Sequence, residues 1–258
     1  KMRYAATEPS EPRGYFPMER ETLSRSRDVD TPPDLKEAFS CGRLTSSEGN
    51  DKTGFFHGPN IWPSRPIGFR RDWETYYQAM ERLSDEIMSL FAVALGLPDS
   101  YFRPYFNCHA SALRALNYPP PDRGAKPLQQ RAGAHSDYGS LTVLKPDPCV
   151  AGLEIQLRDG TWFSAPLVEN DFIINIGDLM SRWTNGRWTS TTHRVTVGQA
   201  SQPAARRQSI AFFQNPNADA VIECLPGCQS ADGSAQHTPV AAGRYLEERF
   251  TATMDGNP

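Results

Sequence analysis

Three side chains of this sequence have the types and the spacing of metal ligands. His135 and Asp137 are two positions apart in RAGAHSDYGSLTVL, and side chains at i and i+2 of a β-strand point to the same face. His193 begins the strand-like segment HRVTV and supplies a third donor. Two imidazoles and one carboxylate form the facial triad of a non-haem Fe(II) oxygenase, which leaves one side of an octahedral metal open. Our working hypothesis is therefore an iron site made by these three residues.

A second pattern fits the recognition of a carboxylate. Arg207 and Ser209 are two positions apart where the apolar segment SIAFFQNPN begins, fourteen positions after His193. A guanidinium binds a carboxylate through two parallel hydrogen bonds, and a hydroxyl on the same strand face adds a third donor. The pair suits a dicarboxylate co-substrate whose other end chelates the metal.

The elements that must position these residues are mostly short strands. After Asp99, segments of β-forming residues alternate with turns, and Asp159-Gly160 is a two-residue hairpin signal, because both central positions of a type I′ turn need positive φ. Many short strands at this spacing predict a mainly β chain folded as a jelly roll, a double-stranded β-helix with flanking helices. The predicted strands are 111–118, 140–144, 152–157, 161–164, 172–176, 193–197, 209–214 and 221–224.

Two helices are expected beside the strands. Apolar residues recur at three- and four-residue spacing over 71–95, and Gly96 and Pro98 end that helix. A second helix is expected within 239–254. Residues 1–66 resemble loop with short elements, and the polar run in 42–54 predicts a mobile segment. We therefore divide one domain into a loop-rich and helical part, 1–98, and a jelly-roll core with a C-terminal helix, 99–258.

Composition excludes several classes of partner. The chain has 258 residues and a net charge of −3, and it has no basic stripe that would favour nucleic acid. No apolar run approaches the roughly 18 residues of a membrane span. The five cysteines are scattered without a CxxC pair, which is typical of reduced thiols in a cytoplasmic protein. We expect a cytoplasmic monomer that acts on a small molecule.

Several motifs together resemble a known family, the Fe(II)/2-oxoglutarate-dependent dioxygenases of the isopenicillin N synthase-like group, and within it the small-molecule hydroxylases of the thymine hydroxylase type. The motifs are RAGAHSDYGSLTVL, GLEIQLRDGTWFSAP, NIGDLMSRWTNGRWTSTTHRV, RRQSIAFFQNPN, DLKEAFSCG and GPNIWPSRPIGF. The resemblance implies that the enzyme uses Fe(II), 2-oxoglutarate and O2. Relatives also begin with a strand of the IPxID type and a helix ahead of these motifs, so we expect residues to be missing from this sequence.

The resemblance also implies roles for individual residues. His135, Asp137 and His193 would be the iron ligands. Arg207 and Ser209 would bind the distal carboxylate of 2-oxoglutarate, and Tyr118 would help to hold the same molecule. The family pattern often has Asn where this chain has Leu116. The residues that match the substrate pockets of relatives are Arg114, Tyr138 and Phe213.

The implied reaction hydroxylates, or otherwise oxidises, an unactivated C–H bond of a small organic molecule while 2-oxoglutarate is converted to succinate and CO2. Three alternatives remain open: an oxidase of the same fold that desaturates or closes a ring, a catalytically silent binding module, and a zinc or manganese jelly-roll enzyme. The other histidines, His57, His109 and His237, are predicted to have no metal role. Cys224, Cys228 and His237 lack the fourth ligand and the spacing of a closed zinc site.

Overall fold

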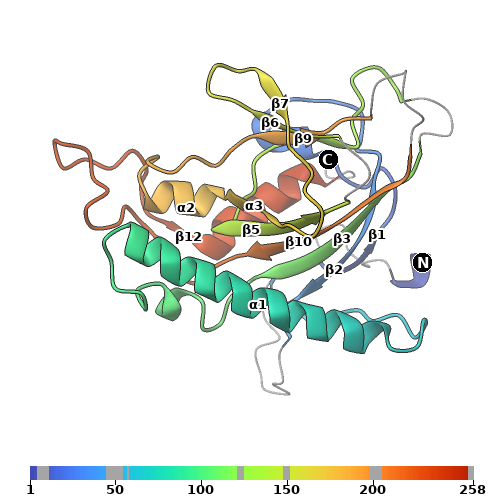
Figure 1. Cartoon of the computed structure of the whole chain (residues 1–258), viewed down its shortest axis with the longest axis horizontal. Helices are drawn as coiled ribbons and strands as arrows, with labels where there is room; N and C mark the ends of the chain where they lie inside the picture. The colour runs from blue at the N-terminus through green and yellow to red at the C-terminus, as the bar shows by residue number, and fades with distance from the viewer. Residues whose placement is uncertain are drawn as a thin grey trace.

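Two antiparallel sheets face each other in the computed structural model, which describes residues 1–4, 12–44, 55–56, 58–120, 125–147, 152–197 and 205–254. Helices flank the sheets, so the predicted mainly β, jelly-roll architecture is confirmed (Figure 1). The larger sheet has the order β1-β2-β3-β10-β5-β8, and the smaller has the order β4-β9-β6-β7. Every pairing between neighbouring strands is antiparallel.

The strands are short, as the spacing of turn residues predicts. In the larger sheet they are β1 (Gly14–Phe16), β2 (Glu37–Gly42), β3 (Ala112–Tyr118), β10 (Arg207–Gln214), β5 (Leu141–Pro146) and β8 (Ile173–Ile176). In the smaller sheet they are β4 (Ala132–His135), β9 (His193–Val195), β6 (Leu153–Gln156) and β7 (Trp162–Ser164). A separate pair consists of β11 (Val221–Ile222) and β12 (Val240–Ala241).

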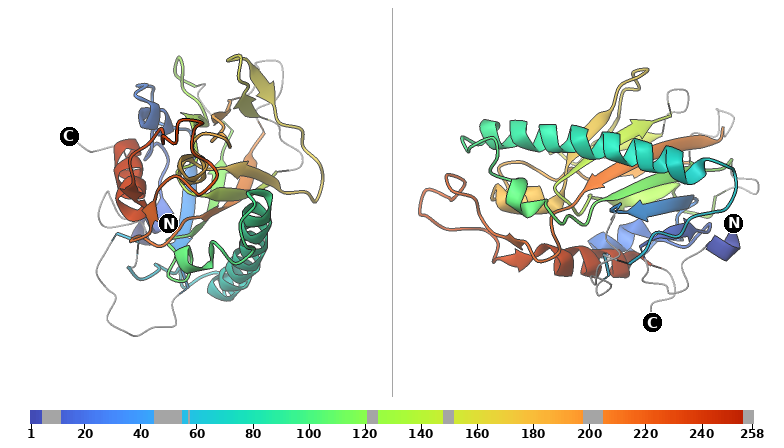
Figure 2. Two further views of the ribbon diagram at one scale, coloured as in Figure 1. Left: turned by 90° about the vertical axis from the view of Figure 1, so that its left-hand side faces the viewer. Right: turned by 90° about the horizontal axis from the view of Figure 1, so that it is seen from below.

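One long helix covers the outer face of the larger sheet. It is α1 (Phe69–Ala94), close to the predicted 71–95, and Figure 2 shows it lying across the strands. The buried Tyr77 packs edge-on against Phe212 of β10 with ring centroids 5.1 Å apart, and its hydroxyl donates to the Ser111 carbonyl at 3.1 Å. This packing leaves the opposite face of the sheet for the cavity between the two sheets.

The other helices are short. They are α2 (Asp178–Trp183), α3 (Ala242–Thr253) and the 3-10 turns η1 (Met2–Tyr4), η2 (Leu23–Arg27) and η3 (Arg103–Tyr105). The predicted C-terminal helix begins later than 239 because Val240 and Ala241 first pair with β11. No helix among the described residues is long and apolar enough to cross a membrane.

The short elements expected within residues 1–66 include β1 and β2, which extend the larger sheet beside β3, so 1–98 and 99–258 share one sheet. Two details of the sequence prediction are wrong. Asp137 lies beyond the end of β4 and not on the strand. The Asp159-Gly160 hairpin exists, but Gly160 donates to the Leu157 carbonyl and Gly160 has positive φ whereas Asp159 does not, so the turn is a longer type that ends in a left-handed glycine. The predicted mobile segment lies largely outside the described residues.

Candidate functional site

The two residues expected to bind a carboxylate, Arg207 and Ser209, lie on the inner face of the larger sheet. Side chains alternate along β10, so Arg207 and Ser209 share one face, and antiparallel register places Arg207 opposite Tyr118 and Ser209 opposite Leu116. Arg114 follows on the same face of β3, opposite Ala211. Strand alternation therefore gathers residues that are about ninety positions apart in the sequence.

The three candidate metal ligands converge where the smaller sheet meets the loop after β4. His135 is the last residue of β4 and pairs directly with His193, the first residue of β9, and their ring centroids are 4.3 Å apart. Oδ1 of Asp137 lies 3.9 Å from Nε2 of His135 and 3.7 Å from Nε2 of His193. The three ligand atoms lie within 4.8 Å of one another, a spacing that one ion can bridge.

Backbone carbonyls orient both imidazoles. Nδ1 of His135 donates to the Gly133 carbonyl at 2.8 Å, and Nδ1 of His193 donates to the Thr191 carbonyl at 3.1 Å. A proton on Nδ1 leaves the lone pair on Nε2, which is the atom that faces Asp137. The tautomer that binds a metal is thus fixed by the strands themselves.

Asp137 is held from two directions. Nδ2 of Asn175, on β8, donates to Oδ2 of Asp137 at 2.6 Å, and the backbone N–H of Asp178 donates to the Asp137 carbonyl at 2.8 Å. Asn175 belongs to the motif NIGD but was not singled out as a site residue from the sequence. Its position in a strand, two residues before Gly177, is the signal that could have pointed to it.

Burial and mutual proximity set the charge states of the ligands. Burial lowers the pKa of His135, and the neighbouring His193 lowers it further, so the imidazole is neutral. Burial favours the protonated form of Asp137, but the two histidines and the hydrogen bond from Asn175 outweigh it and lower the pKa of this carboxyl. A neutral imidazole at His135 and an ionised carboxylate at Asp137 are the protonation states that bind a divalent cation.

One cavity of about 210 Å³ between the two sheets is lined by all nine residues predicted from the sequence. Its wall includes the triad and the co-substrate candidates Tyr118, Arg207 and Ser209, together with the substrate candidates Arg114, Tyr138 and Phe213. Leu116 also lines it.

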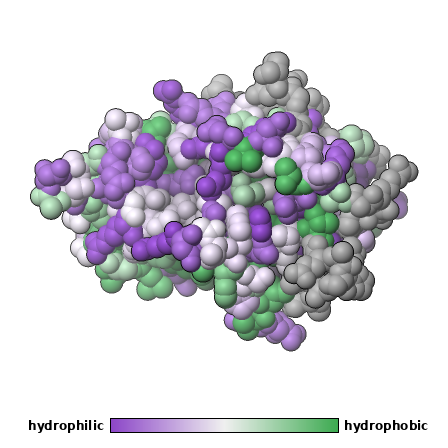
Figure 3. Space-filling view, turned by 90° about the horizontal axis from the view of Figure 1, so that it is seen from above, coloured by the Kyte–Doolittle hydropathy of each residue, from purple (hydrophilic) through white to green (hydrophobic). Residues whose placement is uncertain are grey.

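The surface seen from above, on the side of the smaller sheet, is mostly hydrophilic with scattered hydrophobic residues (Figure 3).

Arg207 is a buried cation whose charge is not balanced by an acid. Its side chain is 1% exposed, Nη1 donates to Oγ of Ser209 at 3.3 Å, and the guanidinium lies 5.1 Å from the ring centroid of Tyr118. Nε has no hydrogen-bond partner, and within the described ranges no carboxylate lies at ion-pair distance. A buried charge without a counter-charge reduces the stability of the fold, and a bound anion would offset this loss. The surroundings of Arg207 therefore favour the binding of an anion.

Arg114, by contrast, already has a partner. Its Nη2 donates to Oε2 of Glu21 at 2.7 Å, and its guanidinium lies 4.5 Å from the ring centroid of Phe16. Lys36, which also lines the cavity, lies 3.4 Å from the same Glu21 oxygen. This buried cluster was not predicted, because charged residues in a polar N-terminal segment resemble surface residues.

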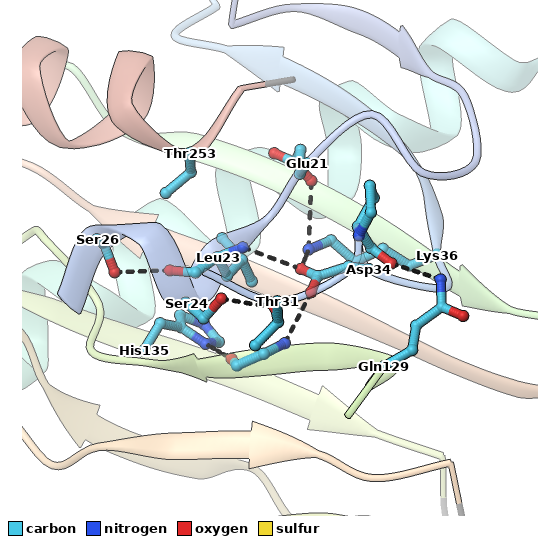
Figure 4. A network of polar contacts seen from close by, with 12 residues as sticks. Glu21, Leu23, Ser24, Ser26, Thr31, Asp34, Lys36, Gln129, His135 and Thr253 are labelled. Atoms are coloured by element: carbon cyan, nitrogen blue, oxygen red, sulfur yellow. Dashed lines mark hydrogen bonds and ion pairs between the residues drawn. The ribbon is translucent and has the colours of Figure 1, made fainter. Parts of the chain in front are cut away.

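The same cluster connects to the metal ligands. Nζ of Lys36 donates to Oδ2 of Asp34 at 2.6 Å, and Oδ1 of Asp34 accepts the backbone N–H of Gly133 at 2.9 Å (Figure 4). Because the carbonyl of Gly133 holds His135, Asp34 supports that ligand through a single residue of β4. Among the described residues, His135, Asp137 and His193 form the single group of three or more potential ligands close enough to share a metal.

The remaining histidines and cysteines lie elsewhere. Nε2 of His109 is 2.6 Å from Oε1 of Glu81 on α1, which is a structural contact between the helix and the segment that precedes β3. Cys224, Cys228 and His237 do not form a metal-binding group in the part of the chain that is described. Both cysteines are free thiols, and His57 lies outside the described residues.

The chain is similar to known proteins in sequence and in overall structure. Residues 108–216 match the model of the 2OG-Fe(II) oxygenase superfamily. The chain is 34% identical over 217 residues to a validamycin A dioxygenase of Streptomyces hygroscopicus subsp. limoneus, covering 83% of this chain and 59% of that protein. It is 37% identical over 254 residues to the 2-oxoglutarate-dependent dioxygenase citB of Monascus ruber, covering 94% of this chain and 74% of that protein.

A solved structure is similar over nearly the whole chain. Full-length Neurospora crassa T7H in complex with alpha-KG superposes with a TM-score of 0.84 at 32% identity, covering 98% of this chain and 77% of that one. The chain thus spans 59% of the length of the first curated relative and about three quarters of the others named here.

Proposed function

Because this chain belongs to the 2OG-Fe(II) oxygenase superfamily, we propose that it is an Fe(II)- and 2-oxoglutarate-dependent dioxygenase. Its reaction is the hydroxylation, or another oxidation, of an unactivated C–H bond in a small organic molecule, with conversion of 2-oxoglutarate to succinate and CO2. One observation carries the proposal: a single cavity contains a His-Asp-His triad and a buried arginine that has no acidic partner in the part of the chain that the structure describes.

The donor set fits Fe(II). Two imidazole nitrogens and one carboxylate oxygen, contributed by His135, His193 and Asp137, are the facial triad of non-haem iron oxygenases, whereas a structural zinc site has four protein ligands. When bound, the iron supplies the O2 chemistry that oxidises the C–H bond. The chain's own residues hold the ligands in the binding tautomer and keep the site between two sheets, away from bulk water.

The co-substrate residues are Arg207, Ser209 and Tyr118. The guanidinium and the hydroxyl supply hydrogen-bond donors to the distal carboxylate, and the negative charge of 2-oxoglutarate compensates the buried cation. Leu116, opposite Ser209, supplies apolar surface at this point and no donor. Replacing both hydrogen-bond donors should abolish the preference of the site for a dicarboxylate.

The substrate is a small molecule that contacts Arg114, Tyr138 and Phe213. Relatives carry names such as homoarginine-6-hydroxylase, and the Neurospora T7H has been crystallised with thymine. Both ligands are small and polar, and the cavity of this chain has polar groups beside an aromatic wall. Burial raises the pKa of Tyr138, so its hydroxyl stays protonated and can donate to such a substrate. We also propose a cytoplasmic monomer without nucleic-acid or membrane partners.

The test is an anaerobic titration of the purified protein with Fe(II) and then with 2-oxoglutarate, following the weak visible charge-transfer band that chelation produces. We expect the band in the wild type, its loss in His193→Ala, and an affinity for 2-oxoglutarate at least about tenfold weaker in Arg207→Ala. Arg206→Ala is the matched control, because Arg206 is exposed and donates to the Asn117 side chain. A folded, iron-loaded wild type that gives no band contradicts the proposal.

Product analysis then separates the possible outcomes of turnover. Succinate release from a panel of small molecules identifies a substrate, and the mass of its product distinguishes the added oxygen atom of hydroxylation from the two lost hydrogens of desaturation or ring closure. Succinate that stays at the uncoupled background for every compound, despite a normal band, would support a binding module.

A further inference from the structure

A second arginine is buried near Arg207. Arg131 is 3% exposed, and its Nη2 donates to the carbonyl of Ala205 at 2.5 Å, two residues before Arg207. Its backbone N–H donates to the carbonyl of Val195 at 2.9 Å. The guanidinium is therefore fixed at the start of β10, behind the cavity wall that Ala132 and Val195 form.

Neither arginine is neutralised by an acid of the described residues. Nε of Arg131 and Nε of Arg207 are both buried without a hydrogen-bond partner. Across the described ranges, no carboxylate lies within ion-pair distance of either guanidinium, whereas the buried Lys36 and the half-buried Arg114 are both paired with acids. Burial lowers the pKa of Arg131, and the like charge of Arg207 lowers it further. Two like charges without an anion are unfavourable in a dry site.

We propose that Arg131 is a positioning residue for the distal carboxylate of the 2-oxo acid co-substrate, and that with Arg207 it makes this end of the cavity selective for dianions. The proposal rests on the proposed function above. Arg207 contacts the carboxylate. Arg131 acts from behind it by its charge and by holding the Ala205 carbonyl, which fixes the segment that leads into β10.

Two co-substrates separate a charge effect from a general structural effect. 2-Oxoglutarate has a distal carboxylate, whereas 2-oxopentanoate has the same carbon chain without it. We expect Arg131→Gln to weaken 2-oxoglutarate binding about tenfold in the anaerobic charge-transfer titration and to leave the weaker binding of 2-oxopentanoate unchanged. Arg131→Lys, which keeps the charge, should stay within about threefold of the wild type for both acids.

Each outcome decides a different claim. Suppose that the wild type binds 2-oxoglutarate. If Arg131→Gln then binds both acids as tightly as the wild type does, or loses affinity for both acids equally, the role of Arg131 is refuted and the proposed function stands. A wild type without a band refutes the proposed function itself. If Arg131→Gln does not fold, Arg131→Met replaces it, and thermal unfolding without ligand checks its fold. A Lys variant that loses the preference for the dianion also refutes the proposal, because its charge is retained.

Discussion

Asn175 donates its side-chain N–H to Oδ2 of Asp137 across 2.6 Å and leaves Oδ1 of the same carboxylate facing His135 and His193. Two adjacent elements thus meet at one ligand: β8 supplies the amide and the loop after β4 supplies the acid. The bond fixes which oxygen is free for the metal. Residues that hydrogen-bond to a metal ligand, without binding the metal themselves, commonly contribute about 10–100-fold to metal affinity.

We expect Asn175→Ala to weaken metal binding about tenfold or more, because the carboxylate can then rotate. Anaerobic titration with Co(II) measures the dissociation constant, and thermal unfolding checks the fold. Ile174→Ala is the control, since Ile174 is the neighbouring residue of β8 and is 47% exposed. Equal metal affinity in Asn175→Ala and the wild type would show that packing alone positions Asp137.

Gly177→Ala should damage both the fold and the metal site. A Cβ at Gly177 would lie 2.2 Å from the Gly139 carbonyl oxygen, which is backbone and cannot swing away. Gly139 follows Asp137 in HSDYG, so the two segments that hold the acid would be pushed apart. We expect a loss of unfolding free energy of about 3 kcal/mol and weaker Co(II) binding, measured by urea unfolding and titration. Gly58→Ala, where a Cβ makes an ordinary 3.6 Å contact, should unfold as the wild type does.

Glu21→Gln should be strongly destabilising at neutral pH. Burial alone would raise the pKa of Glu21, but the ion pairs with Arg114 and Lys36 lower it to about 2. A lowered carboxyl pKa gives stability that is fully present above the unfolded value of about 4.5 and is lost as the pH falls toward 2. We expect a difference of about 3 kcal/mol at pH 7 that shrinks below pH 4.5, measured by urea unfolding at several pH values.

The control for this pH effect is Glu248→Gln. Glu248 forms an exposed pair with Arg244 on α3, and such pairs contribute little to stability. Its unfolding free energy should follow that of the wild type at every pH. A Glu21 variant whose difference from the wild type does not change with pH would mean that Glu21 is not ionised in the folded protein.

Asp34→Ala should weaken both the fold and metal binding. The substitution removes the 2.6 Å partner of Lys36 and the acceptor of the Gly133 N–H, which precedes His135 by two residues. We expect a loss of about 3 kcal/mol in unfolding free energy and about tenfold weaker Co(II) binding. Asp30→Ala removes an acid whose side chain is 89% exposed and should change neither quantity. If Co(II) affinity survives in Asp34→Ala, the cluster serves stability alone.

Residue types and spacing were sufficient to identify the groups that could bind metal and carboxylate. His135, Asp137 and Arg207 stand in short local patterns, and strand alternation makes an i, i+2 pair meaningful before any coordinates exist. The strand predicted over 209–214 matches most of β10, whereas β4, which ends at His135, was not predicted, and Asp137 lies beyond its end. The sequence pattern did not locate β2 within the segment expected to be loop with short elements, because its strand character depends on pairing with β3.

Tertiary structure alone decided which charges are paired. The sequence shows Glu21, Lys36 and Arg131 as ordinary charged residues, and nothing local distinguishes a surface charge from a buried one. The fold brings Glu21 to Arg114 and Lys36, but it brings no acid of the described residues to Arg131 or Arg207. Charge balance depends on neighbours in space, and these neighbours come from segments up to about ninety residues apart in the sequence. The sequence therefore determined which chemical groups are available, and the fold determined where an anion is needed.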